Sequence, residues 1–189
     1  MIRGYKTELE PNNKQITLFK KGCGTARFAY NWGLEIKTKA IQKRKEGSKD
    51  KVPTSIDLHK ELVKLKKTDY SWMYEVSKCS PHESLRNLDV AFKNFYTKCK
   101  LKKQGKWNKK VGYPQAKSKK NGLGSFRMYS CIHVTGSHIQ LPRIGDVRLK
   151  EHNYIPQDAH ILSVTVSEKA NRWFVSVQIE EPDKPFIKT

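Results

Sequence analysis

Residues 161–179, ILSVTVSEKANRWFVSVQI, decide the fold class of this chain. The first part, Ile161 to Val166, is rich in β-branched residues, and the second part alternates apolar with polar side chains (Trp173, Val175, Val177, Ile179). A period of two is typical of a strand with one buried face. Lys169-Ala170-Asn171 separates the two runs, so the pattern predicts an antiparallel hairpin.

The same period of two extends back along the chain to about Gly112. Apolar residues alternate with polar neighbours at Phe126, Met128, Ile132, Val134, Ile139, Leu141, Val147 and Leu149. Thr135-Gly136-Ser137 predicts a hairpin turn within this region. Near the other end of the sequence, Ile2 to Leu9 predicts a further strand that ends at Pro11.

Helical spacing of apolar residues fills the region between the first strand and the later ones. We expect a short helix capped by Asn12 or Asn13 that Gly22 and Gly24 break, and a second helix over residues 25–45.

A third helix is predicted to begin at Thr54 or Ser55. The clearest local signal follows, because Ser80-Pro81-His82-Glu83 has the pattern of a capping box with proline at the first helical position. The order of one strand, several helices and then several strands predicts an α+β fold. A small antiparallel β-barrel with a helical insertion fits this order best.

The charge of the chain predicts a polyanionic partner. Its 189 residues include 38 Lys+Arg against 18 Asp+Glu, a formal net charge of +20. Such a balance is typical of proteins that meet nucleic acid or an anionic membrane surface. No apolar run approaches the roughly 20 residues of a membrane-spanning helix, so we expect no membrane partner.

The distribution of charge favours nucleic acid. No acidic residue lies between Asp89 and Asp146, whereas this interval carries Lys93, Lys98, Lys100, Lys102, Lys103, Lys106, Lys109, Lys110, Lys117, Lys119, Lys120, Arg127 and Arg143. A surface of one sign is suited to phosphates, which release counterions when they are neutralised. The interleaved aromatic residues could stack on unpaired bases: Tyr96, Trp107, Tyr113, Phe126 and Tyr129. The alternative is a flexible basic loop with incidental aromatic residues.

No pattern of a catalytic or metal site is present in the sequence. The four cysteines form no C-x-x-C pair, and no carboxylates are grouped as a metal-dependent phosphodiesterase requires. His133 and His138 flank a turn without a neighbouring ligand residue, so a structural role is the simpler interpretation. The sequence therefore predicts neither catalytic residues nor a metal site.

Several ordered motifs resemble the TnpB (OrfB) family, the transposon-encoded RNA-guided nucleases related to type V CRISPR effectors. The matching stretches are Tyr5-Lys6 with Pro11 and Gln15, Ala26-Arg27-Phe28 with Tyr30-Asn31-Trp32, Trp72 with Glu75-Val76, Ser84 to Asp89 with Ala91 to Phe95, Gly112-Tyr113-Pro114 with Lys117-Ser118-Lys119, Ser125-Phe126-Arg127, Leu141-Pro142 with Gly145, and Val164-Thr165-Val166 with Trp173. They follow one another in order along nearly the whole chain.

The resemblance implies a wedge domain, a small barrel made from a first strand (residues 1–10) and the later strands (111–189), around an inserted helical recognition lobe (11–110). Its partners would be a guide RNA and target double-stranded DNA in the prokaryotic cytoplasm. We expect the RuvC nuclease domain to be absent from this chain, whose connection to that domain would begin near residues 182–185. Mg and Zn are then expected only in the missing part, and this chain would hold no cofactor.

The resemblance also implies positions that read a short DNA motif beside the target: Ser55, His59, Lys78, His82 and Cys131. His82 stands where the family often has Gln, while Pro81 and Ala116 replace a common aliphatic residue and a common Phe. We expect His82 to face solvent at a helix N-terminus, where anions are attracted. The candidates for RNA or phosphate binding are Arg27, Lys98, Lys102, Lys103, Lys106, Trp107, Lys109, Lys110, Tyr113, Lys117, Lys119, Lys120 and Arg127.

Three hypotheses follow from the sequence. The chain is the nucleic-acid-binding part of a TnpB-like endonuclease, or the recognition subunit of a nuclease that a separate RuvC-containing polypeptide completes, or a DNA-binding regulator without nuclease function.

Overall fold

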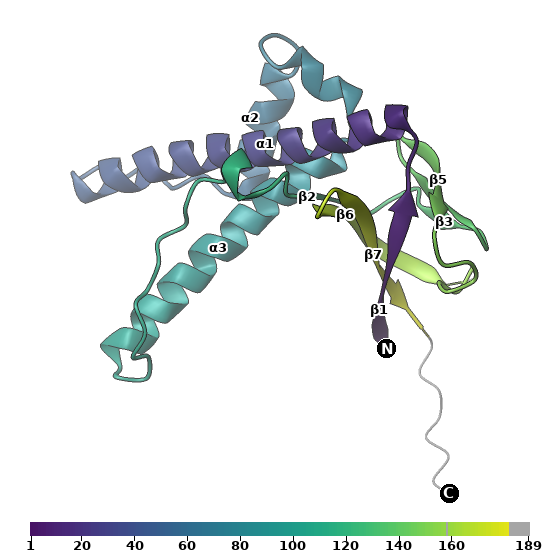
Figure 1. Cartoon of the computed structure of the whole chain (residues 1–189). Coiled ribbons are helices and arrows are strands. Elements are labelled where there is room, and N and C mark those ends of the chain that lie inside the picture. Colours follow the sequence, from purple (N-terminus) through teal and green to yellow (C-terminus); the bar gives the residue numbers. More distant parts are fainter. Residues whose placement is uncertain (158, 182–189) are drawn as a thin grey trace, which may run out of the picture.

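The computed structural model describes residues 1–157 and 159–181, which form a sheet and a group of helices side by side (Figure 1). The elements in chain order are β1 (Ile2–Glu10), α1 (Asn13–Lys45), α2 (Ser55–Leu65), a 3₁₀ turn (Ser71–Glu75), α3 (Cys79–Lys103), a second 3₁₀ turn (Lys119–Asn121), β2 (Ser125–Met128), β3 (His133–Val134), β4 (His138–Leu141), β5 (Gly145–Leu149), β6 (His160–Lys169) and β7 (Arg172–Glu180). The predicted α+β class is confirmed.

The sheet is antiparallel throughout, with the described strands in the order β2-β6-β7-β1-β5-β4-β3. The hairpin predicted from residues 161–179 is confirmed as β6 and β7, since Lys169 pairs with Arg172 across a turn. Ala170 and Asn171 take φ values of 52° and 60° there, as a tight hairpin turn requires at both central positions. The turn predicted at residues 135–137 is also confirmed, because Thr135 N–H donates to the carbonyl of His138 at 2.9 Å.

The predicted barrel is wrong in one respect, because the sheet is not closed. Its edge strands β2 and β3 do not pair with each other. β3 has only two residues, and β2 lies against helices α1 and α3, so helices cover that edge. The two edges are nevertheless joined by residues 129–132 alone, which can span at most about 17 Å. The sheet therefore curls strongly without completing a barrel.

Helix α1 is continuous from Asn13 to Lys45, so the predicted break at Gly22 and Gly24 is wrong. Gly22 is needed for packing: a Cβ there would lie 2.9 Å from Cδ1 of Phe126 on β2. At Gly24 a Cβ would meet nothing within 4 Å. The glycine at position 22 thus marks a close approach between helix and sheet instead of a helix end.

Two hydrophobic cores share helix α1. Its first half contributes Phe19, Cys23 and Ala26 to the core under the sheet. Its second half contributes Ala29, Tyr30 and Leu34 to a separate core with α2 and α3. A second close approach occurs in this helical core, where a Cβ on Gly33 would lie 2.7 Å from Cδ2 of Leu85.

A part-buried ion pair joins the three helices. The ammonium of Lys37, a residue only 6% exposed, donates to the carboxylate of Asp89. The other carboxylate oxygen of Asp89 accepts a hydrogen bond from the backbone N–H of Ser55 at 2.8 Å. Burial alone would raise the pKa of Asp89, but the hydrogen bonds from Lys37 and Ser55 outweigh it and hold this pKa below its usual value.

The helix starts differ in how well the sequence predicted them. Asn12 caps α1 in a capping box with Gln15, and Thr54 caps α2 in a box with Asp57, so both predicted starts are confirmed. The box predicted at residues 80–83 is wrong, because α3 begins at Cys79 and its cap residue Lys78 makes no side-chain capping bond.

Ser80 and Glu83 are instead buried in contacts with other elements. The Ser80 hydroxyl donates to the carbonyl of Gly22 at 3.0 Å. Glu83 accepts from Arg86 at 2.8 Å and lies 3.8 Å from Nε of Arg127. The side chains that the local pattern predicted to cap α3 therefore form tertiary contacts with α1 and the sheet instead.

No helix among residues 1–157 and 159–181 has the length and apolar character to cross a bilayer.

We expect the two glycines of α1 to respond oppositely to alanine. Gly24→Ala should stabilise the fold by about 1 kcal/mol, since it lowers the entropy cost of forming the helix without a clash. Gly22→Ala should destabilise it by about 1–2 kcal/mol, because Phe126 must move from its packed position. Urea unfolding of both variants measures the free energies, and equal effects of the same sign would contradict the close-approach interpretation.

Removing the partner of Lys37 should be costly. Asp89→Asn leaves a buried ammonium without its carboxylate, and since Asp89 is itself part-exposed we expect a loss of about 2–3 kcal/mol. The double variant Lys37→Met/Asp89→Asn should recover most of this loss. Because the pKa of Asp89 is depressed, its contribution should be full above about pH 4 and disappear as the pH falls below the folded-state value. Additive single and double effects in urea unfolding would show that the pair is uncoupled.

Candidate nucleic-acid interface

Four of the five residues implied for DNA-motif reading lie where α2, the start of α3 and the segment after β2 meet. The rings of His59 and His82 have centroids 4.6 Å apart. Nδ1 of His82 is hydrogen-bonded to the hydroxyl of Tyr129 at 2.7 Å. Lys78 and Cys131 line the same hollow beside them. We call this region the histidine face: His59, Lys78, His82, Tyr129 and Cys131.

The two histidines are half-buried, so His82 does not project freely into solvent as expected. Burial lowers the pKa of His59, and His82 and two neighbouring lysines lower it further. Near neutral pH the His59 ring is therefore uncharged, and a neutral imidazole both donates and accepts hydrogen bonds. Its Nδ1 has no partner among the described residues. This nitrogen is buried, so a base edge would reach it only after neighbouring side chains move.

Ser55, the fifth candidate, stands one helical turn before His59 on α2. Its backbone N–H is committed to Asp89, while its side chain is part-exposed at the helix start. Residues four apart lie on the same side of a helix, which places Ser55 at the margin of the histidine face.

A hollow of about 440 Å³ opens beside the histidine face. Besides Lys78 and Cys131, it is lined by Lys66 and Arg143, which the sequence reasoning did not single out. A signal was present for Lys66, because it continues the four-residue spacing of the buried Leu58 and Leu62. A lysine on the buried stripe of a helix is unusual.

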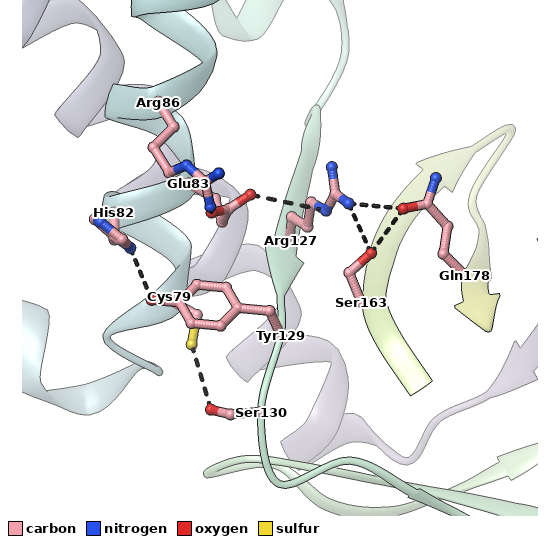
Figure 2. Close-up of polar contacts among 9 residues, drawn as sticks. All are labelled: Cys79, His82, Glu83, Arg86, Arg127, Tyr129, Ser130, Ser163 and Gln178. Carbon is pink, nitrogen blue, oxygen red and sulfur yellow. Dashed lines mark hydrogen bonds and ion pairs between the residues drawn. The ribbon is translucent and has the colours of Figure 1, made fainter. Parts of the chain in front are cut away.

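A chain of polar contacts connects the start of α3 to the sheet (Figure 2). Arg127 on β2 lies at its centre and donates to Ser163 and Gln178, both at 2.7 Å. Its Nε faces the buried carboxylate of Glu83 at 3.8 Å. The structure thus places Arg127, a candidate for RNA binding, within contacts that hold helices and sheet together.

The larger group of RNA-binding candidates lies at the far end of α3 and in the chain that follows it, away from the sheet (Figure 1). All six of its lysines are exposed: Lys98, Lys102, Lys103, Lys106, Lys109 and Lys110. None of the six forms an ion pair with a carboxylate in residues 1–157 or 159–181. We call residues 98–110 the basic arm.

Trp107 and Tyr113, both named as candidates, pack back onto the helices. The ammonium of Lys98 lies 5.3 Å from the centroid of the Trp107 ring, and the indole N–H is buried without a partner in the part of the chain that the structure describes. Tyr113 packs edge-on against Phe92 and Phe95. Both rings are half-buried, so each offers only part of its surface for stacking.

The other interleaved aromatic residues have different positions. Phe126 is 4% exposed and belongs to the core under the sheet, so the stacking interpretation is wrong for it. Tyr96 is 50% exposed and keeps a free surface. Burial of alternate residues in β2 explains why composition alone could not separate these cases.

The remaining candidates lie near the middle of α1. Arg27 donates to the carbonyl of Leu123 at 3.1 Å. Asn31 holds the backbone of Lys117 through two hydrogen bonds of 2.8 and 2.9 Å, and the Lys117 ammonium lies 4.4 Å from the centre of the Tyr30 ring. Lys119 and Lys120 are exposed in the 3₁₀ turn that follows. Arg27 and Lys117 also line a second hollow of about 290 Å³.

No group of three or more His, Cys, Asp or Glu side chains that could hold a metal ion occurs within residues 1–157 and 159–181. The cysteines are free thiols, and burial raises the pKa of Cys23 to about 12.

A family model described as a helix-turn-helix domain of OrfB (IS605) matches residues 1–46. In this chain that region is a strand followed by one uninterrupted helix, so it contains no turn between two helices. The matched region therefore supports the family relationship without providing the docking geometry of a helix-turn-helix motif.

Two curated proteins are similar over nearly the whole chain. A putative RNA-guided DNA endonuclease of Streptomyces pristinaespiralis is 27% identical over 97% of this chain and 42% of its own length. The putative RNA-guided DNA endonuclease InsQ of Escherichia coli (strain K12) is 25% identical over 95% of this chain and 40% of its own length. The chain thus spans about two fifths of the length of these relatives. Together the matches confirm what the motifs indicated: this chain resembles the TnpB (OrfB) family of proteins.

Proposed function

We propose that this chain is the nucleic-acid-binding portion of a TnpB-like RNA-guided DNA endonuclease. The observation that carries the proposal is the basic arm, a projecting end of α3 whose exposed lysines have no carboxylate partner among the described residues. Unpaired cations on a projecting helix suit a phosphate backbone, since each phosphate they neutralise releases counterions.

In this proposal the curled sheet corresponds to the family's wedge domain and the helices to its recognition lobe. Support comes from the names of the two relatives, which describe RNA-guided DNA endonucleases, and from the order of strand, helices and strands. The guide RNA would lie along the basic arm. Cleavage would require residues beyond the two fifths of the relatives that this chain matches.

The histidine face would read the DNA motif. Support comes from the gathering of His59, Lys78, His82 and Cys131 from three separate segments. Imidazole rings can hydrogen-bond base edges, which carry sequence information, whereas Lys78 can contact a phosphate, which carries none.

Removing charge from the basic arm should weaken RNA binding in a salt-dependent way. For Lys98→Gln/Lys102→Gln/Lys106→Gln, the slope of log K against log salt should decrease by up to about 2, at about 0.7 for each lost contact with single-stranded RNA. Fluorescence anisotropy with RNA from the transposon end measures this slope.

The matched control is Lys14→Gln/Lys20→Gln/Lys169→Gln, which removes three exposed lysines outside the arm. Its slope should stay near that of the unchanged chain. Equal losses in both triple variants would contradict a role for the arm, and equal affinity for transposon-end and scrambled RNA would contradict guide specificity.

Substitutions on the histidine face should distinguish residues that contact base edges from residues that contact phosphates. His82→Ala should relax the sequence preference for duplexes selected from a library with a randomised stretch, because it removes a base-edge contact. Lys78→Ala should weaken all sequences alike, because it removes a phosphate contact. His152→Ala, which removes an exposed histidine outside this face, serves as control. An unchanged preference profile in His82→Ala would exclude His82 as a reader.

A further inference from the structure

Lys66 is a buried cation without a carboxylate partner. It follows the last turn of α2, is 5% exposed, and its ammonium makes no hydrogen bond or ion pair with any other residue in the described part of the chain. The ammonium is not among the fully buried polar atoms without a partner, so the tip of this side chain keeps access to solvent. A lysine whose side chain is this deeply buried without a counter-charge still costs folding free energy and is rare. Its presence at a position of the buried stripe therefore calls for a ligand that is not part of this chain.

Lys66 belongs to the lining of the 440 Å³ hollow, which carries cationic side chains from several segments. Lys78 and Arg143 line it as well, and no carboxylate does. The hollow also borders the start of α3 through Ser77, Lys78 and Cys79. At this helix start the backbone N–H of Cys79 donates to the Ser77 hydroxyl at 3.3 Å, and that of Ser80 donates to the Ser77 carbonyl at 3.2 Å. The cationic side chains of the lining, and not the N–H groups of the helix, are therefore the groups that can hold an anion here.

A hydrogen bond to the backbone fixes the position of Arg143 at the edge of the hollow. Arg143 donates through Nη1 to the carbonyl of Tyr74 at 2.8 Å, which orients its guanidinium at the rim and leaves other N–H groups free for a ligand. Arg143 and Cys131 both have left-handed backbone conformations, with φ of 66° and 53°. Such strained conformations in residues other than glycine tend to gather at functional sites.

The pKa of Lys66 is consistent with an ammonium that lacks a counter-charge. Burial lowers the pKa of Lys66, and the charge of Arg143 lowers it further. A bound anion would oppose both effects and favour the charged ammonium.

We propose that this hollow binds a phosphate group, held by Lys66, Lys78 and Arg143. The proposal rests on the proposed function in one respect: the phosphate is taken to be one of the DNA backbone beside the histidine face, since the two regions share Lys78 and Cys131. Free inorganic phosphate offers the same chemistry and is the other source.

The first experiment uses inorganic phosphate and the purified full chain. Thermal unfolding at constant ionic strength should show a saturable rise in Tm with phosphate, because a ligand of the folded state stabilises it. Lys66→Met should bind phosphate about tenfold more weakly, as expected for the loss of a charge-assisted hydrogen bond. Lys67→Met, which removes the neighbouring exposed charge, should respond like the unchanged chain.

The stability without phosphate distinguishes a ligand-binding lysine from a structural one. Lys66→Met should be as stable as the unchanged chain or more stable, since it removes a buried charge and keeps the length of the side chain. A Lys66→Met variant that unfolds more easily, or that responds to phosphate as Lys67→Met does, would overturn the proposal. Arg143→Gln gives a second test at the exposed rim, where the same weakening is expected.

The second experiment uses duplex DNA over a salt series. Lys66→Met should lower the slope of log K against log salt by about 0.9, the value for one lost phosphate contact on duplex DNA, and Lys67→Met should not. DNA binding with an unchanged slope in Lys66→Met would overturn the DNA assignment and leave the proposed function standing. If the unchanged chain binds no nucleic acid while Lys66 still governs the response to phosphate, the proposed function fails and the site is one for free phosphate.

Discussion

The close approach of two elements to one face of helix α1 is the constraint on which the structure depends. Gly22 receives the Phe126 ring from β2, and Gly33 receives Leu85 from α3. The two glycines are eleven residues apart, about three helical turns, so both contacts fall on the same side of the helix. A single continuous helix therefore carries both hydrophobic cores. The placement of α2 and α3 relative to the sheet, and with it the histidine face, follows from these two contacts.

The polar groups between helices and sheet divide into those satisfied inside the chain and those left for a partner. Glu83 and Arg127 face each other, and Ser163 and Gln178 complete the chain of contacts (Figure 2). Arg127 Nη2 is hydrogen-bonded, whereas its buried Nε has only the charge of Glu83 opposite it at 3.8 Å, and together these contacts fix α3 against β2. The cations without such partners, Lys66 and the lysines of the basic arm, border surfaces that a polyanion can reach. Polar contacts within the chain thus position the helices against the sheet, and the cations without a carboxylate partner lie where we propose that nucleic acid binds.

Local sequence patterns correctly predicted the features that depend on interactions between residues close together in the sequence. The hairpin at residues 161–179 and the helix starts at Asn12 and Thr54 depend on near neighbours, and they were predicted correctly. The errors at Gly22 and at the capping box of residues 80–83 arose where distant segments decide the outcome. Motif resemblance brought together the four clustered residues of the candidate site, but periodicity could not foresee that Lys66 is buried without a partner or that Arg127 is engaged by the sheet.

The short link between the sheet edges has a consequence for how the chain can vary in length. Residues 129–132 alone connect β2 at one edge to β3 at the other, and Tyr129 and Cys131 within this link also belong to the histidine face. An inserted residue would both loosen the curl of the sheet and displace these side chains. The tip after α3, around Gly105, is exposed and closes no sheet. The fold should therefore accept an inserted sequence at that tip, which lies within the basic arm, and should lose stability when one is placed in the link.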